Sequence, residues 1–144
     1  MAFSPKTPYL ATDGIVEITD ETGEFLGIVL IARKNPPLGL ALPGGFVDVG
    51  ERVEDALTRE MREEISLDVS LQYLLGIYSD PARDCRFHTA SAVYVAKASH
   101  MPKAADDAKE AYVFSLDTIP FDKLVFDHKK ILEDYLTVRA KAKR

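Results

Sequence analysis

The segment from Phe25 to Ala32 reads FLGIVLIA and is apolar along almost its whole length. A strand with one solvated face alternates apolar and polar residues, whereas a continuous apolar run of this kind is typical of a strand buried on both faces. A sheet that contains such a strand needs a covering layer on each side. The segment therefore predicts a layered architecture with this strand near the centre of a sheet.

Further apolar segments supply the remaining elements. Strands are predicted at Asp13–Thr19, Val69–Tyr78, Ala90–Ala98 and Ala111–Leu116, and amphipathic helices at Arg52–Ile65 and Leu124–Arg139. The strands outnumber the helices, and the connections are too irregular for a doubly wound parallel sheet. The pattern predicts an α/β fold with a mixed β-sheet and a helix on each face.

Composition restricts the class of protein. The 144 residues suit one domain spanning 1–144. A net charge of −5 argues against a nucleic-acid-binding module. No apolar run reaches the length of a membrane span, and the N-terminus lacks the apolar core of a signal peptide. The single cysteine, Cys85, excludes an intrachain disulfide and fits a reducing compartment. We predict a cytoplasmic protein without membrane or nucleic-acid partners.

The predicted helix at 52–65 carries carboxylates where apolar side chains are expected. At about 100° per residue, Val53, Leu57 and Met61 form an apolar stripe. Glu64 falls within this stripe, Glu60 lies at its edge, and Glu63 is one step further out. Two carboxylates near 4 Å repel by about 4 kcal/mol at an effective dielectric constant near 20. Either one carboxylate is protonated or a cation lies among them.

A hard divalent cation, Mg²⁺ or Mn²⁺, satisfies such a set of oxygen ligands. Glu60 and Glu64 are four residues apart and can chelate from one face of a helix. Arg59 can orient a carboxylate through paired hydrogen bonds. Upstream, Gly44 and Gly45 can bring bare backbone carbonyls to the same ion. These residues predict a metal site that faces an anionic phosphate ligand.

The stretch from Gly45 to Leu67 (GFVDVGERVEDALTREMREEISL) closely resembles the Nudix box. The matching positions are Gly45, Glu51, Arg59, Glu60, Met61, Glu63, Glu64 and Leu67. Ser66 stands where that family usually has a glycine, which resembles a helix-ending residue with positive φ. Serine at this position should cost on the order of 1 kcal/mol or shift the end of the helix.

Other segments are similar to the ADP-ribose pyrophosphatase branch of that family. They are Arg33–Pro37, Ala41–Val47, Tyr78–Asp84, Asp106–Glu110 and Phe126–His128. The resemblance implies an α/β/α sandwich with a mixed β-sheet between helices. It also implies metal-dependent hydrolysis of a nucleoside diphosphate linked to another group, such as ADP-ribose to AMP and ribose 5-phosphate.

The resemblance further implies roles for individual residues. Glu60 and Glu64 become the main metal ligands, Glu63 a further ligand or the base, and the Gly45 carbonyl an additional ligand. Arg59 and Glu51 hold the helix and the preceding loop together. Glu110, at the end of the loop over 101–110, is the candidate general base, and its alternative is an exposed loop charge.

Substrate contacts are less specific in the sequence. Arg33 and Arg83 suit phosphate or ribose groups, with solvated surface positions as the alternative. Asp80 suits a ribose hydroxyl, although a turn-forming aspartate fits equally well. The three histidines show no metal-ligand spacing, and structural or surface roles are expected for them.

Two rival functions remain open. One is a pyrophosphatase for nucleoside triphosphates, dinucleotides or other nucleotide sugars. The other is a non-catalytic regulator with the same fold, although such a module is expected to lose its box carboxylates. Members of this branch are often homodimers, so the resemblance also implies a possible homodimer.

Overall fold

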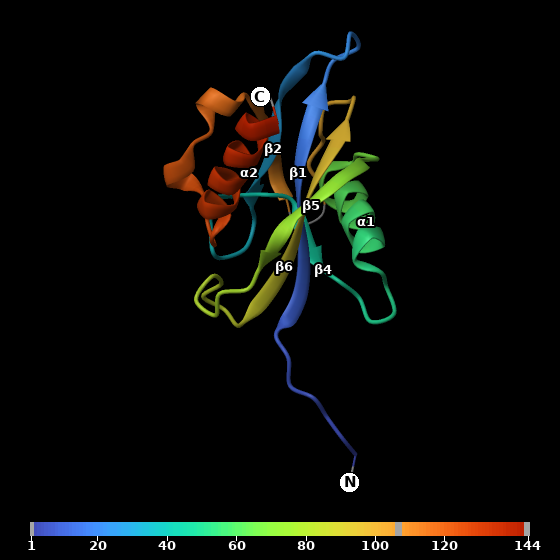
Figure 1. Ribbon diagram of the computed structural model, residues 1–144, viewed down its shortest axis with the longest axis vertical. Coiled ribbons are helices and arrows are strands. Elements are labelled where there is room, and N and C mark those ends of the chain that lie inside the picture. Colours follow the sequence, from blue (N-terminus) through green and yellow to red (C-terminus); the bar gives the residue numbers. More distant parts are fainter. Residues whose placement is uncertain (1, 106–107, 143–144) are drawn as a thin grey trace.

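One mixed sheet lies between two helices in the computed structural model (Figure 1). The structure describes residues 2–105 and 108–142, so Asp106 and Asp107 lie outside the described residues. The strands are β1 (Tyr9–Thr19), β2 (Phe25–Arg33), β3 (Leu40–Ala41), β4 (Gly44–Phe46), β5 (Ser70–Tyr78), β6 (Thr89–Ala98) and β7 (Ala108–Phe114). The helices are α1 (Val53–Ile65) and α2 (His128–Ala142), with short 3₁₀ turns at Leu116–Thr118 and Phe121–Lys123.

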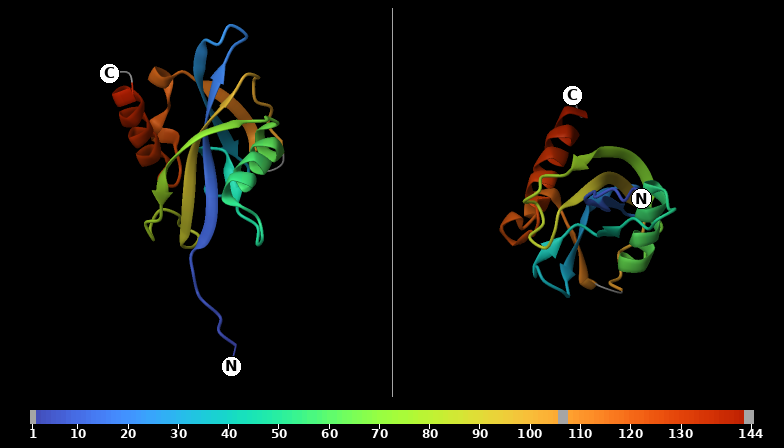
Figure 2. Two further views of the ribbon diagram at one scale, coloured as in Figure 1. Left: turned by 45° about the vertical axis from the view of Figure 1, so that its right-hand side comes forward. Right: turned by 90° about the horizontal axis from the view of Figure 1, so that it is seen from below.

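The sheet is mixed, as predicted. Its main strand order is β3-β2-β1-β6-β5, with β4 beside β1 and β7 beside β2. β1 and β6 are parallel, whereas the other strand pairs are antiparallel. Seen along the strands, α1 and α2 lie on opposite sides of the sheet (Figure 2). The α/β/α sandwich is therefore confirmed.

The central apolar run is buried on both faces. Ile28, Val29 and Leu30 of β2 have no exposed surface. Val29 belongs to the core cluster beneath α1, and Ile28 and Leu30 belong to the cluster beneath α2. Because successive side chains of a strand point to opposite faces, each helix covers one half of the run.

Two strands are longer than the sequence predicted. β1 begins at Tyr9 rather than Asp13, because Tyr9 to Ile18 pair continuously with β6. β7 begins at Ala108 rather than Ala111, because its first residues pair with the end of β2. Both extensions depend on partner strands that are distant in the sequence, so local apolar periodicity does not reveal them.

Helix α2 begins later in the sequence than predicted. It begins at His128 rather than Leu124. Phe126 has a φ of 56°, in the left-handed region, and this conformation interrupts any helix that would start earlier. None of the helices among the described residues is long and apolar enough to cross a membrane.

Helix α1 ends at the predicted place despite the serine. Ser66 adopts φ 59° and ψ 36°, and its N–H donates to the Arg62 carbonyl at 3.2 Å. The left-handed cap expected of glycine is thus formed by a residue with a side chain, at the expense of local strain.

Relief of this strain predicts a stabilising substitution. Ser66→Gly should raise the free energy of unfolding by about 0.5–1 kcal/mol, because the relieved strain exceeds the added entropy of the unfolded chain. Urea denaturation of the two proteins measures the difference. The neighbouring exposed Asp68→Gly is the control and should not stabilise. A destabilised Ser66→Gly protein would contradict the strain argument.

Candidate active site

Arg59 lies at the centre of the acidic face of α1. Its guanidinium donates to Glu51 at 2.7 and 2.9 Å, to Glu60 at 2.9 Å and to Glu63 at 3.1 Å. It also donates to the Phe46 carbonyl at 3.0 Å. One cation therefore joins the helix to the loop that precedes it and offsets the repulsion among the carboxylates. The hydrogen bonds from Arg59 lower the pKa of Glu51 to about 2.

The remaining carboxylates lie against the two glycines of β4. Burial raises the pKa of Glu60 above its ordinary value, and the charges of Glu63 and Asp48 add to that effect while Arg59 opposes it. Glu64 is almost fully buried, and one of its oxygens accepts a hydrogen bond from the Gly44 N–H at 3.3 Å. These carboxylates thus lie partly out of water beside exposed backbone of β4.

Gly45 leaves room for the Glu60 carboxylate. A β-carbon at Gly45 would overlap the carboxyl atoms of Glu60, and one at Gly44 would overlap Asp13 and the Thr12 carbonyl. A side chain at Gly44 would thus overlap backbone, whereas one at Gly45 would displace the carboxyl end of Glu60. The two glycines allow carboxylates to approach the same short strand from both faces of the sheet.

The carboxylate and carbonyl oxygens around Gly45 are the kind of ligand that a hard divalent cation requires. The partial burial of Glu60 and its raised pKa indicate a carboxylate that an added positive charge would stabilise. Within residues 2–105 and 108–142, no three His, Cys, Asp or Glu side chains are already gathered as a ligand set. Instead Arg59 occupies the position of counter-ion, so the residues fit a cation that competes with this arginine.

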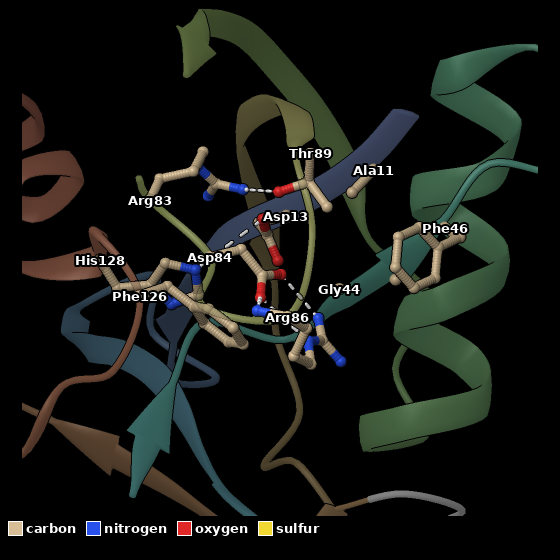
Figure 3. Close-up of a pocket in the computed structure, with 11 residues that line it drawn as sticks. Ala11, Asp13, Gly44, Phe46, Arg83, Asp84, Arg86, Thr89, Phe126 and His128 are labelled. Atoms are coloured by element: carbon tan, nitrogen blue, oxygen red, sulfur yellow. Dashed lines mark hydrogen bonds and ion pairs between the residues drawn. The ribbon is translucent and has the colours of Figure 1, made fainter. Parts of the chain in front are cut away.

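A pocket lies on the other side of β4, beneath the start of α2 (Figure 3). Gly44 and Gly45 form part of its wall, so the pocket adjoins the acidic face of α1. Other lining side chains come from β1, from the loop before β6 and from the segment that enters α2. They are Asp13 on β1, Arg83, Asp84 and Arg86 in the loop, and Phe126 and His128 where the chain enters α2.

Asp13 and His128 lie together at the α2 side of this pocket. The Asp13 carboxylate accepts a hydrogen bond from Ser91 at 2.5 Å and lies 3.9 Å from Nε2 of His128. Burial raises the pKa of Asp13 to about 6. Burial also lowers the pKa of His128 to about 3, so this imidazole is neutral near pH 7. Nδ1 of His128 accepts from the Leu42 N–H at 2.9 Å, which places the imidazole proton on Nε2.

The raised pKa of Asp13 predicts a pH-dependent stability. A carboxyl with a higher pKa in the folded state than in the unfolded state binds its proton more tightly when folded, so its ionisation reduces stability as the pH rises. Relative to the wild type, Asp13→Asn should gain up to about 1.4 kcal/mol of unfolding free energy per pH unit between about pH 4 and 6. Urea titrations at several pH values measure this difference. A difference that stays flat or falls across that window would contradict the burial of an ionised carboxylate.

Arg83 is buried rather than solvated. Its guanidinium donates to both oxygens of Asp127, at 2.8 and 3.0 Å, and to Thr89 at 2.7 Å. These bonds tie the loop before β6 to the segment that enters α2. Arg83 therefore braces the pocket wall, and three of its five N–H groups donate to protein acceptors.

Asp80 forms a turn and does not line this pocket. One of its carboxylate oxygens accepts from the Ala82 N–H at 2.8 Å, and its side chain is exposed. The turn-forming alternative is thus the one that the structure shows. Arg33 does not line this pocket either; its guanidinium lies 4.9 Å from the centre of the Phe126 ring and donates to the Pro37 carbonyl.

The prediction that Glu110 ends a loop is wrong. Glu110 lies within β7, opposite Ala32 of β2. It shares a face of the strand with Tyr112, whose hydroxyl donates to its carboxylate, and with Phe114, which packs beneath α2. The carboxylates of α1 lie beyond the opposite face, so the structure does not bring Glu110 to them.

Several pocket residues were not identified from the sequence. The sequence indicates no specific role for Asp13, Arg86 or Phe126, and only a structural or surface role for His128. Two signals were available. Asp13 interrupts the start of an apolar strand, and His128 belongs to a segment that resembles the family branch. A buried charge in a strand needs a partner, which makes it a reason to search for a site.

A family model described as the NUDIX domain matches residues 8–135 of the chain. The fold, the position of the acidic helix and this match together define the class: the chain belongs to the Nudix family and is a Nudix hydrolase.

Individual relatives make the comparison more specific. The chain is 47% identical over 132 residues to the ADP-ribose pyrophosphatase of Methanocaldococcus jannaschii, covering 90% of this chain and 73% of that protein. Its fold matches a MutT/nudix family protein from Enterococcus faecalis with a TM-score of 0.80 and 29% identity, over 93% of this chain and 62% of that one.

A third relative was solved with ligands. It is a bifunctional NMN adenylyltransferase/ADP ribose pyrophosphatase from Francisella tularensis, complexed with AMP and a manganese ion. The TM-score is 0.78 at 26% identity, over 92% of this chain and 42% of that one. The chain thus spans less than two thirds of either solved chain.

Proposed function

We propose that this Nudix hydrolase cleaves the diphosphate of ADP-ribose to give AMP and ribose 5-phosphate. The observation that carries the proposal is the acidic face of α1, which adjoins a pocket across the two glycines of β4. The likeness to an ADP-ribose pyrophosphatase supports the choice of substrate. In this arrangement the nucleotide enters the pocket and its diphosphate passes Gly44 and Gly45 toward the carboxylates.

The reaction needs water and the diphosphate as reactants. The water oxygen forms a bond to one phosphorus, and the bond between that phosphorus and the bridging oxygen breaks. The bridging oxygen leaves with the other phosphate, and a base takes the proton from the water. Glu63 is the proposed base, because its side chain is 47% exposed and therefore more accessible to water than Glu60, at 15%.

Glu60, Glu63, Glu64 and the Gly45 carbonyl are the proposed ligands of Mg²⁺ or Mn²⁺. When bound, such an ion neutralises charge that develops on the phosphate oxygens. Arg59 and Glu51 keep α1 and the preceding loop in register, through the two hydrogen bonds at 2.7 and 2.9 Å. Arg33, which packs on the pocket residue Phe126, is the proposed contact for a phosphate or ribose oxygen.

The test is a panel of substrates in water enriched in heavy oxygen. ADP-ribose should be turned over at least tenfold more efficiently than diadenosine polyphosphates, nucleoside triphosphates or NADH. Mass analysis of the products shows which phosphate carries the label and hence which phosphorus is attacked. Preferred turnover of a triphosphate would replace the proposed substrate, and binding without turnover at saturating Mg²⁺ would indicate a regulator.

Three further expectations accompany this proposal. We expect Mg²⁺ to support turnover, a homodimer in solution and a cytoplasmic location without nucleic-acid partners. Metal titration after chelation tests the first, and light scattering during size-exclusion chromatography tests the second. Fractionation of the source cells tests the location, and a filter-binding assay with RNA and DNA tests the absence of nucleic-acid binding.

A further inference from the structure

Nε2 of His128 presents a donor to the pocket without a protein acceptor. The residue is 2% exposed, and its Nδ1 is already occupied by the Leu42 N–H. Its Nε2 therefore carries the proton, and the nearest carboxylate oxygen, on Asp13, is 3.9 Å away. That distance is too long for a hydrogen bond. In the described part of the chain, this N–H has no hydrogen-bond acceptor.

Asp13 supplies an acceptor beside this donor. Ser91 fixes the carboxylate through a hydrogen bond of 2.5 Å, and Asp13 and His128 both line the pocket (Figure 3). A donor and an acceptor that line one pocket 3.9 Å apart, without a hydrogen bond between them, are both available to a ligand. A ligand group that accepts from Nε2 and donates to the carboxylate would satisfy the pair.

Aromatic rings close to this pair fit the nucleoside end of a substrate. The ring of Phe126 lies 5.3 Å from that of His128, and the Arg86 guanidinium lies 5.3 Å from the centre of the Phe126 ring. Phe46 and Phe87 form a second aromatic contact at 5.9 Å on the rim. Flat aromatic and guanidinium surfaces suit stacking with a nucleobase.

We propose that Asp13 and His128 form a specificity site that reads the nucleoside through one paired donor and acceptor. The group that is read is a hydroxyl of the adenosine ribose or the amino and ring-nitrogen edge of adenine, which share this chemistry. The proposal rests on the proposed function for its substrate. It extends that function by assigning selection of the nucleoside to residues on the face of the sheet opposite the acidic helix.

The experiment compares kcat/KM for four substrates with the full chain and Mg²⁺. They are ADP-ribose, its inosine analogue, and its analogues without the 2′- or 3′-hydroxyl of the adenosine ribose. The wild type should discriminate against one class of analogue by about 10- to 100-fold, because the analogue leaves a buried charged group unpaired. A lower kcat/KM for the inosine analogue would identify the edge of adenine as the group that is read. A lower kcat/KM for a deoxy analogue would identify the ribose hydroxyl.

Variants of Asp13 and His128 then test whether these two residues cause the difference in kcat/KM between substrates. Asp13→Asn should reduce it to below about threefold, and His128→Gln, which can still accept from Leu42, should do the same. Exposed Asp117→Asn is the matched control and should keep the full ratio. A loosened fold lowers turnover of all four substrates together, so the ratio reports the contact and not stability. Equal use of all four substrates by the wild type, or full discrimination by Asp13→Asn, would overturn the proposal.

Failure of the specificity site can be distinguished from failure of the proposed hydrolase function. If no substrate is hydrolysed, the proposed function fails, and calorimetric binding of AMP, IMP and the two deoxy-AMPs tests the pair directly. Preferential binding of AMP that Asp13→Asn abolishes would support the specificity site. Equal binding of the four nucleotides, or binding of none, would refute it.

Discussion

Glu64→Gln is expected to lower kcat for ADP-ribose by about 10³-fold while the protein stays folded. The amide keeps an oxygen that can accept from the Gly44 N–H, so the packing of α1 on β4 is preserved. It removes the negative charge of the least exposed proposed ligand. Loss of metal-centred charge stabilisation is worth several kcal/mol, and each 1.36 kcal/mol is a factor of ten in rate. Steady-state kinetics at saturating Mg²⁺, with thermal unfolding of the same samples, measure both effects.

Glu54→Gln is the matched control on the same helix. Glu54 is exposed, and its carboxylate accepts from the Tyr94 hydroxyl at 2.9 Å, a bond that an amide oxygen can replace. This variant should retain kcat within about twofold, because it lies outside the proposed ligand set. Wild-type turnover by Glu64→Gln would remove the acidic helix from the mechanism.

The second large effect is expected at the paired glycines, where two similar substitutions should fail in different ways. At Gly45, an added β-carbon meets only the carboxyl end of Glu60, which can swing away. Gly45→Ala should therefore lower kcat by about 10²-fold, because the displaced carboxylate is a proposed ligand, and should change stability by less than about 1 kcal/mol.

At Gly44, the added β-carbon meets the Thr12 carbonyl and the backbone of Asp13, which cannot move independently of β1. Gly44→Ala should therefore destabilise the fold by about 2–3 kcal/mol. Denaturant titration and kinetics of both variants give the comparison. Gly50→Ala provides a control with open space around the added methyl group, although its φ of 86° adds local strain. An equal loss of stability in Gly44→Ala and Gly45→Ala would contradict the assignment of the two faces.

Elements with strong local periodicity could be predicted from the sequence. The run at Phe25–Ala32 and the helix predicted at Arg52–Ile65 correspond to β2 and α1 within a residue at each end. Strand β4 could not be predicted, because the two glycines of Gly44–Phe46 disfavour a strand and the segment is held by its pairing with β1. The start of α2 was misplaced because it depends on the left-handed conformation of Phe126.

The candidate site likewise has one part that the sequence predicts and one part that it does not. The acidic helix was predictable, because fixed spacing along one helix places its carboxylates together. The pocket was not, since Asp13 and His128 are brought together by a chain path that no local pattern describes. Arg83 shows the limit most clearly. Its residue type suits a phosphate, but its burial and its two hydrogen bonds to Asp127, 44 positions away, follow only from the fold.

Arg59 gives the acidic helix an internal counter-ion. Because its guanidinium already contacts Glu51, Glu60 and Glu63, the folded chain does not depend on a divalent ion to hold these like charges together. A bound divalent ion would take over Glu60 and Glu63 from Arg59, which can keep its two hydrogen bonds to Glu51. Cycles of chelation and readdition should therefore switch catalysis off and on without a cycle of unfolding and refolding.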